Sequence, residues 1–363
     1  MATKEIDRRT FVGVAALAGA LALKRGGAHA KPRSVTLMSA ARFGEEDRGA
    51  VLDGEGFSSF PLPARGHGMA ELKDGRVMLV GRRPATFAAI LERETPERAR
   101  VVTPLRGHRF AGHAAVNGRG QIATSEIDAE TGEGVAVLRD GDGAPRQSFP
   151  VGIEPHDLLF AGDDRLVVAV GGIARAADVK GPALNAGNIE SAVLELDARS
   201  GRALKRHVLG GTERSLSLRH MALAPDGETI AVGMQDQDRS QARPVMALLR
   251  LGGGLDLLPL PKGDEPAFRS YIGSVAIDTA GRYVAATSPK GGIVGVWRLT
   301  DGSWFAGYRL ADVCGLTTAD EPGTFWATSG YGDVVHLRAD EPGVTALAHW
   351  RAAAAFDNHL LRI

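Results

Sequence analysis

The sequence is poor in cysteine and has no extended basic run. Its 363 residues include one cysteine, Cys314, which excludes an internal disulfide and every site built on paired cysteines. Lysine and arginine together number 43, as do aspartate and glutamate, so neither nucleic acid nor another polyanion is expected as a partner. The sequence also lacks an HExxH zinc motif, a nucleophile elbow and a phosphate-binding loop. Sequence motifs therefore give little support to an enzymatic activity.

The one long apolar run, "FVGVAALAGALAL", lies within the first thirty residues. Its thirteen residues are too few for a span of about 20 helical residues. Arg8 and Arg9 precede it, and "AHA" (28–30) offers small residues for cleavage. We expect residues 1–30 to be a cleaved twin-arginine signal and the protein to be periplasmic, without stable membrane insertion. The alternative is an uncut N-terminal anchor with the same topology.

Internal repetition is the strongest signal in the sequence. Each copy has a short apolar strand, a turn rich in Asp or Gly, and a second strand with a polar end. The clearest copies are "HAAVNGRGQIATSEID" from His113, "HDLLFAGDDRLVVAVGG" from His156, "HMALAPDGETIAVGMQD" from His220, "SVAIDTAGRYVAATSPK" from Ser274 and "CGLTTADEPGTFWATSG" from Cys314. Third and fourth strands follow each pair, as in 191–209. Periods of roughly 40 to 50 residues indicate a β-propeller.

Seven units start at residues 67, 113, 156, 220, 274, 314 and 359, and the longest interval holds an expected excursion loop at 174–188. The seventh unit ends after one strand, so we expect residues 34–62 to supply its missing strands. A blade shared by the two termini closes the ring and removes exposed edge strands. The sequence predicts an all-β, seven-bladed propeller of the WD40 or YVTN type, as a single domain over residues 31–363. A pair of β-sandwiches, the alternative, leaves the single last strand unexplained.

Propeller geometry predicts where the polar residues meet. The start of each innermost strand and the end of the second lie at the same face, here called the top, around the central channel. Asp128, Asp236, Ser288 and Cys314 share this register. The candidate ligand-binding residues at the top are Arg65, His67, Arg82, Arg83, His108, Arg109, Glu126, Arg219, Gln235 and Lys290. The candidate metal ligands are His113, His156, His220 and His359.

Two interpretations of these histidines stay open. Each ring could hydrogen-bond within its own blade and staple it. Alternatively, several imidazoles point into the channel and bind a metal such as Fe, Cu, Zn or Ni, or an anion, with acids such as Glu126 and Asp157 behind them. Cys314 falls in the same register, either as a thiolate ligand or as a small buried residue.

The arginines are open to two interpretations as well. Arg82, Arg83, Arg219 and Lys290 suggest a cationic rim for carboxylate or phosphate groups, because the arginine fork matches these bidentately. Alternatively, they form ion pairs with Glu126, Asp128, Asp236 and Asp312 across blades. "GHRFAGH" (107–113) is expected to be one short top loop carrying His108, Arg109 and His113.

Several segments together resemble a known family. "PARGHG", "GRRPATFA", "GHRFAGH", "GIEPHDL", "SLSLRHMA", "ATSPKGG", "ADVCGL" and "DNHL" are similar, in this order, to the exported bacterial family called domain of unknown function 1513. The resemblance runs from about Ser34 to Ile363 and implies a seven-bladed propeller with a twin-arginine signal. The family's genes lie beside those of imelysin-like periplasmic proteins, which implies an accessory role in iron acquisition. Iron, haem or an imelysin-like partner protein is then the expected ligand.

Three functional hypotheses follow. The first is a periplasmic, non-enzymatic propeller whose top funnel binds a ligand or partner in iron acquisition. The second is an interaction scaffold in which the top residues only staple the blades. The third is a metal-dependent propeller enzyme resembling a lactonase or dehydrogenase. Imidazoles close to a common point favour the first hypothesis, and rings turned into their own blades favour the second.

Overall fold

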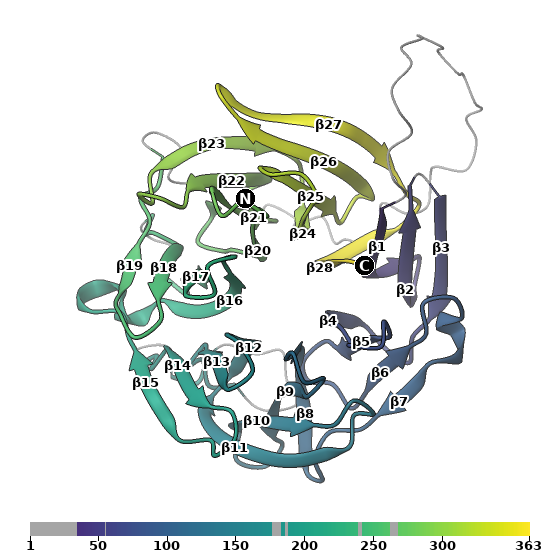
Figure 1. Cartoon of the computed structure of the whole chain (residues 1–363), viewed down its shortest axis with the longest axis vertical. Coiled ribbons are helices and arrows are strands. Elements are labelled where there is room, and N and C mark those ends of the chain that lie inside the picture. The colour runs from purple at the N-terminus through teal and green to yellow at the C-terminus, as the bar shows by residue number, and fades with distance from the viewer. Residues whose placement is uncertain (1–34, 55, 176–182, 186–187, 239–241, 262–267) are drawn as a thin grey trace, which may run out of the picture.

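Seven four-stranded antiparallel sheets surround a central axis like the blades of a propeller (Figure 1). This arrangement is seen in a computed structural model that describes residues 35–54, 56–175, 183–185, 188–238, 242–261 and 268–363. The predicted all-β, seven-bladed propeller is confirmed, and the sandwich alternative is excluded. The predicted signal peptide lies outside the described residues.

Each blade is named here by its innermost strand, and the strands run outward in the order given. The β4 blade contains β4 (Gly66–Glu71), β5 (Val77–Gly81), β6 (Ala88–Leu91) and β7 (Arg100–Val102), with the short helix η1 (Pro96–Arg98). The β8 blade contains β8 (His108–Val116), β9 (Ile122–Asp128), β10 (Glu133–Arg139) and β11 (Pro145–Ile153). The β12 blade contains β12 (Pro155–Phe160), β13 (Arg165–Val170), β14 (Ala192–Asp197) and β15 (Ala203–His207).

The short helix η2 (Gly211–Ser215) leads into the β16 blade, which contains β16 (Ser217–Leu223), β17 (Thr229–Gln235), β18 (Met246–Arg250) and β19 (Leu255–Leu257). The β20 blade contains β20 (Ser274–Ile277), β21 (Tyr283–Ser288), β22 (Ile293–Arg298) and β23 (Trp304–Arg309). The β24 blade contains β24 (Val313–Thr318), β25 (Thr324–Ser329), β26 (Asp333–Asp340) and β27 (Gly343–Arg351).

The two ends of the described chain share the seventh blade. Its innermost strand is β28 (Ala355–Arg362), which pairs with β1 (Thr36–Phe43), followed by β2 (Glu46–Asp53) and β3 (Gly56–Pro61). The inner strands contact one another in sequence, β4 with β8 and onward to β24, β28 and back to β4. The ring is therefore closed as predicted, and no inner strand is left as an exposed edge.

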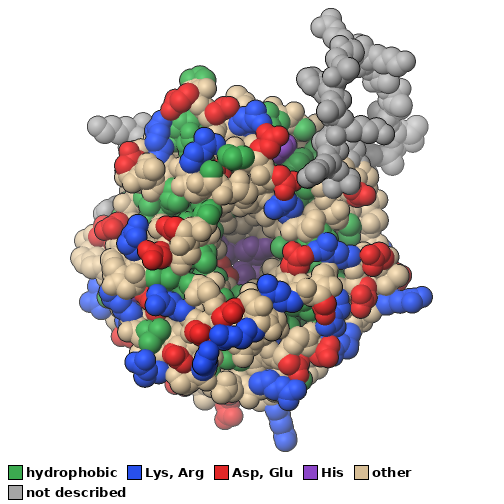
Figure 2. All heavy atoms as spheres, in the orientation of Figure 1, with side chains coloured by type: hydrophobic (Ala, Val, Ile, Leu, Met, Phe, Trp, Pro, Cys, Tyr) green, Lys and Arg blue, Asp and Glu red, His purple; other side chains and the backbone are tan. Residues whose placement is uncertain are grey.

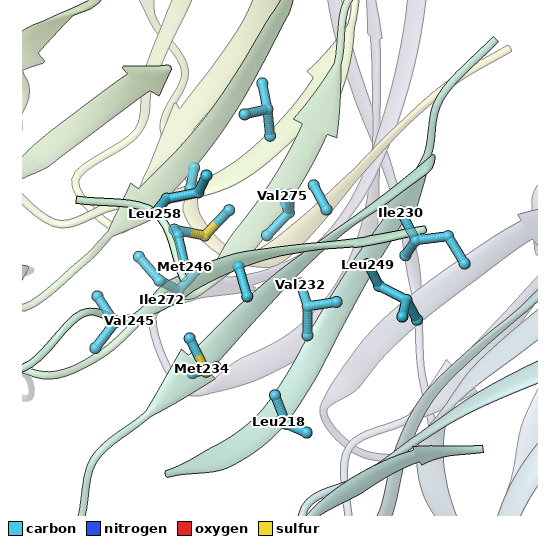
Figure 3. Close-up of a cluster of buried hydrophobic side chains, with 14 of the residues drawn as sticks. Leu218, Ile230, Val232, Met234, Val245, Met246, Leu249, Leu258, Ile272 and Val275 are labelled. Atoms are coloured by element: carbon cyan, nitrogen blue, oxygen red, sulfur yellow. The ribbon is translucent and has the colours of Figure 1, made fainter. Parts of the chain in front are cut away.

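The hydrophobic core lies between the blades. Each blade packs against a neighbour on both faces, so the second strands are apolar runs without in-out alternation, and all five residues of β5 are buried. The largest cluster of buried side chains joins β16 and β17 to the neighbouring blades, with Leu218, Met234 and Ile272 among its members (Figure 3). Burial of each such aliphatic side chain contributes about 1.5–3 kcal/mol, so stability is spread around the ring.

The connections between first and second strands are mostly tight turns at the end of each blade far from the predicted site. In the β16 blade, for example, the Asp226 carboxylate accepts hydrogen bonds from the backbone N–H groups of Glu228 and Thr229, while Gly227 takes a positive φ of 71°. The expected excursion loop is the connection from β13 to β14, part of which lies outside the described residues. The helices in the described part of the chain, η1 and η2, are both far too short to cross a membrane.

Candidate functional site

Five imidazole rings meet in the central channel. They come from the innermost strands of five blades and are called the five-histidine cluster: His67 (β4), His113 (β8), His156 (β12), His220 (β16) and His359 (β28). Ring centroids of contacting pairs are 4.5 Å (His67–His359) to 5.7 Å (His113–His220) apart. His113 touches the other four rings. Histidine side chains are visible deep in the central hollow of the molecule (Figure 2). The rings thus converge on one another across blades.

Irregular strand pairing accompanies every histidine of the cluster. In each of the five blades, the register between the inner strand and its neighbour shifts at or beside the histidine. In the β12 blade, for instance, Pro155 pairs with Val170 and Asp157 with Ala169, which leaves His156 as the extra residue. A β-bulge bends the strand and redirects a side chain, and bulges are over-represented next to active sites. The bulges direct the rings into the channel.

Two glycines make room for the rings. At Gly112, a Cβ atom would lie 2.8 Å from Cδ2 of His67, and the φ of 113° is itself unfavourable for other residues. At Gly68, a Cβ atom would lie 2.5 Å from the carbonyl oxygen of Gly112. The close approach of His67 and His113 therefore depends on the absence of side chains at these two positions.

The cluster is held in the neutral form. Four of the rings are buried and His359 is half-buried. Burial, together with the mutual repulsion of neighbouring rings, lowers the pKa of both His67 and His359 from 6.5 to about 3. Burial likewise lowers the pKa of His113, His156 and His220 well below 6.5. Neutral imidazoles are the form that binds metals.

Hydrogen bonds fix the tautomers of two rings. His67 Nδ1 lies 3.0 Å from Oδ1 of Asp357, which can only accept while ionised, so Nδ1 carries the proton and Nε2 keeps a free lone pair. A carboxylate behind a histidine in this way is typical of metal ligands. His156 is the opposite case, because Nη1 of Arg219 donates to its Nδ1 at 3.1 Å. Its proton must then sit on Nε2.

Several ring nitrogens have no hydrogen-bond partner within the described part of the chain. They are Nδ1 of His113, Nε2 of His156 and both nitrogens of His220. Buried polar groups are normally paired, and each exception calls for an explanation. A blade staple would use these nitrogens within its own blade. The unpaired nitrogens instead belong to rings that face one another across the channel.

The geometry suits a metal ion. Ligand nitrogens of two triads, His67–His113–His156 and His113–His220–His359, lie within 4.8 Å of one another. The Nε2 atoms of His113 and His359 are 3.0 Å apart. Two nitrogens that each lie about 2.1 Å from a shared ion are about 3.0–3.4 Å apart for angles of 90–109°. The His113–His359 pair therefore already has the spacing of two ligands on one ion, and the third ligand nitrogen, from His220, lies within 4.8 Å of both.

Two buried carboxylates anchor the arginines around the cluster. Burial by itself would raise the pKa of Asp357, but the hydrogen bond from His67 and the charges of Arg82 and Arg65 hold this pKa well below its usual value. Glu154 pairs with Arg83 and, at 2.8 Å, with Arg219, whose charges hold its pKa low against the opposing effect of burial. The backbone of Glu154 has a φ of 60°, a strained conformation that is common at functional sites.

A cavity of about 250 Å³ adjoins the cluster in the channel. His113 and His359 form part of its wall, together with Asp157, Met69 and Met221. Burial raises the pKa of Asp157 to about 7, although its carboxylate accepts backbone hydrogen bonds from Met221 (2.9 Å) and Leu158 (2.8 Å). The cluster thus borders a chamber that contains a titratable acid.

A family match covers most of the chain. Residues 60–363 match the family described as "Protein of unknown function (DUF1513)". The chain belongs to the DUF1513 family. No curated protein matches this DUF1513 chain in sequence.

The solved structures similar to the DUF1513 chain agree in fold. "Kuenenia stuttgartiensis Hydrazine Synthase" matches with a TM-score of 0.61 and 14% identity, covering 92% of this chain and 99% of that one. "Crystal Structure of Mitotic Checkpoint Complex" matches with 0.59 and 11%, covering 93% and 90%. "Structure of U3-55K" matches with 0.58 and 10%, covering 82% and 85%. At these identities the similarity concerns the fold alone.

Several other candidate residues of the DUF1513 chain lie outside the cluster. The segment 107–113, expected to be a loop, is largely strand β8, so that prediction was wrong. Its extension is held by pairing to β9 as far as Asp128 and by a bridge from Phe110 to Ala85. His108 and Arg109 stand at the start of β8, five and four residues before His113, and the register shift after Phe110 separates them from it. The chain thus places only His113 of this segment in the cluster.

Glu126 is enclosed in the β8 blade. Its carboxylate pairs with the fully buried Arg139 and accepts hydrogen bonds from Thr124 (2.9 Å) and the backbone of Leu105 (2.8 Å). Cys314 is buried with its Sγ 3.4 Å from the carbonyl oxygen of Phe356. Neither residue belongs to the two histidine triads.

Gln235 and Lys290 gather around a tyrosine that sequence reasoning missed. Gln235 forms a bridge with Tyr271, and the Lys290 ammonium lies 4.8 Å from the centre of the Tyr271 ring. The Tyr271 hydroxyl accepts a hydrogen bond of 2.8 Å from Asn358, next to His359. Tyr271 therefore links Lys290 to the strand that carries His359, whereas Gln235 meets Tyr271 through its backbone.

Glu154 and Asp357 were also missed as partners of the arginines. Both precede a cluster histidine by two residues, His156 and His359. The spacing alone does not indicate a shared face, because Glu154 precedes strand β12 with a φ of 60° and Asp357 lies at the register shift of β28. The ion pairs of Arg82, Arg83 and Arg219 cross between blades, but with acids other than those expected from the sequence.

Proposed function

We propose that this DUF1513 protein is a periplasmic metal-binding propeller, exported through the twin-arginine pathway, that acts as an accessory protein in iron acquisition. The five-histidine cluster is its metal site. The observation that carries the proposal is the convergence of five neutral imidazoles from five blades, with buried nitrogens that have no protein partner among the described residues. Imidazole nitrogen suits Fe, Cu, Zn and Ni.

The energetic cost of the cluster supports a ligand over staples. A buried polar group without a hydrogen bond costs about 1–3 kcal/mol. The rings of His113, His156 and His220 have four such nitrogens between them. A staple would lower the free energy of the folded state, whereas this arrangement raises it until a ligand binds. Sites that oppose stability in this way are expected to be functional.

A metal ion suits the cluster better than haem does. The rings contact one another edge-on or tilted, with interplanar angles of 51–85° and centroids about 5 Å apart. A flat macrocycle would need a slot between separated side chains, and the rings pack too closely to provide one. The iron role itself is supported by the resemblance to exported proteins encoded beside imelysin-like partners, and iron is accordingly the ion that we propose.

Metal content tests the proposal directly. The mature protein would be purified from its own periplasm, and its Fe, Cu, Zn and Ni would be measured against protein concentration. The double variant H113A/H220A should lose the metal, because both triads contain His113 and one contains His220. The matched control is H349A, which removes a histidine in an outer strand that pairs with Asp333 at 2.9 Å. Circular dichroism would check that each variant is folded.

The outcomes separate the hypotheses. About one metal per chain in the wild type and in H349A, with none in the folded double variant, would support the proposal. A wild type that holds no metal and takes up none when Fe(II), Fe(III), Cu(II) or Zn(II) is added would refute the metal site. The iron role has its own test: a deletion strain should grow poorly under iron limitation and be rescued by the wild type but not by H113A/H220A.

A further inference from the structure

The side chains around the cluster carry more positive than negative charge, which disfavours binding of a metal cation alone. Four guanidinium groups but only two ionised carboxylates border the five neutral rings, and each carboxylate is shared by two arginines: Arg65 and Arg82 on Asp357, Arg83 and Arg219 on Glu154. Slightly farther out, Asp157 and Lys290 contribute one group of each sign. The surroundings thus carry a formal excess of two positive charges, and a divalent ion alone would add two more.

Two buried hydrogen-bond donors are available beside the rings. The proton of His156 must sit on Nε2, because Arg219 donates to Nδ1 at 3.1 Å. This Nε2–H has no partner among the residues described, and neither has Nε of the same Arg219 guanidinium. Both side chains are more than nine-tenths buried. An N–H donor cannot bind a metal through that nitrogen, but it can bind an anion.

We propose that the site binds its metal ion together with a small oxyanion or carboxylate, such as carbonate, phosphate or acetate, and that His156 and Arg219 hold this anion. The inference rests on the proposed metal function. It assigns the metal to the triad His113–His220–His359, whose ligand atoms lie within 4.8 Å of one another. His156, whose ring centroid is 4.7 Å from that of His220, then faces the anion beside the metal.

The chemistry of the donors supports this class of ligand. The guanidinium fork matches carboxylates and oxyanions, and hydrogen bonds to an ionised acceptor are stronger than neutral ones. An anion would offset the excess positive charge and satisfy the unpaired N–H group that it contacts. A second metal in the triad His67–His113–His156 would do neither, because it would add charge and compete with the proton on His156.

The test uses Cu(II) as a spectroscopic probe in the mature protein. Bicarbonate, phosphate and acetate would each be titrated into the Cu(II)-loaded protein while the d–d absorption band is followed, and metal content would be measured in parallel. The variants are R219M, which removes the charged fork, and H156F, which keeps a ring without N–H groups. The control R93M removes an exposed arginine that pairs with Glu71 at the end of β4, next to the β4–β5 turn.

The expected result is a shift of the Cu(II) band with at least one of the three anions in the wild type and in R93M. In R219M and H156F, Cu(II) should still bind while the affinity for the anion falls about tenfold or more, which corresponds to the loss of one hydrogen bond to a charged group. If R219M does not fold, H156F still provides the test.

Four results would overturn the inference. Copper that binds while no anion shifts the band would refute the anion site and leave the metal site intact. Unchanged anion affinity in a folded R219M or H156F would remove these residues from the anion site, and loss of copper in H156F would make His156 a metal ligand. Failure of the wild type to bind any metal would instead refute the proposed function, and the anion site with it. The differences among the three anions would show which oxyanion or carboxylate the site prefers.

Discussion

Replacement of His220 with leucine is expected to stabilise the metal-free protein. His220 is only 2% exposed, and neither of its ring nitrogens has a hydrogen-bond partner in the described chain. Its neighbours in the channel are other imidazole rings, His113, His156 and His359. The polar ring therefore contributes a desolvation cost without a compensating hydrogen bond.

The magnitude follows from two opposing terms. A buried, unsatisfied polar group costs about 1–3 kcal/mol, and His220 has two such nitrogens. Leucine has a similar volume but a different shape, and such swaps usually cost less than about 1.5 kcal/mol. The net expectation is a rise of about 1–2 kcal/mol in the free energy of unfolding of the metal-free protein.

The assay is urea denaturation in EDTA, with the midpoint and slope compared between the wild type and H220L. The matched control is H207L, because His207 is also buried but donates to Glu195 at 2.6 Å. The free energy of unfolding of H207L should be lower than that of the wild type by about 1–3 kcal/mol. Added metal should raise the stability of the wild type by mass action and leave H220L unchanged. A loss of 2 kcal/mol or more in H220L would show that His220 is a structural staple.

Three further predictions concern the rest of the site. G112A should lower the free energy of unfolding by about 1–3 kcal/mol and weaken metal binding, because a Cβ atom at this positive-φ position would lie 2.8 Å from the His67 ring. An unchanged metal affinity, measured by calorimetry, would contradict this prediction. Acid should destabilise the metal-free protein, since folding lowers the pKa of His67 and His359 from 6.5 to about 3. The unfolded chain then binds protons that the folded chain does not, so this stability is complete above about pH 6.5 and is lost toward pH 3. Between these pH values the free energy of unfolding should fall by about 1.4 kcal/mol per pH unit for each histidine. A urea midpoint that stays constant from pH 7.5 to pH 5 would refute this prediction. E126L leaves the buried Arg139 without its carboxylate partner and should lower the free energy of unfolding by about 3–5 kcal/mol. The folded fraction of E126L should still bind metal with the affinity of the wild type.

The fold was predictable because its signals are local and repeated. A strand pair with a Gly- or Asp-containing turn recurs six times, and the incomplete seventh unit indicated where the N-terminal strands must pair. The apolar second strands carried the information that both faces of each blade are buried, as the burial of β13 and β17 illustrates. Because the same pattern recurs along the chain, a signal too weak to interpret in one unit becomes clear when the units are compared.

The site was only partly predictable because bulges and long-range pairs leave little trace in sequence. The shared register placed His67, His113 and His156 at the channel, and the structure brings them together. Sequence alone left open whether the rings face the channel or their own blades, since that depends on the register shifts beside them. The partner acids were missed because Asp357 reaches a blade almost three hundred residues away.

The propeller explains why the site is one-sided. Its symmetry offers the same inner position seven times, and the β20 and β24 blades place Ser274 and Cys314 there in place of histidine. These two strands contribute Ser274–Ile277 and Leu316–Thr318 to the wall of the cavity of about 250 Å³. Because Ser274 and Cys314 are smaller than histidine, the β20 and β24 blades leave the chamber free of further rings. The cluster therefore borders the chamber on this side and the arginines on the opposite side. A ligand can therefore reach His113 and His359 from the chamber, and Glu154 fixes Arg219, which in turn fixes the His156 ring.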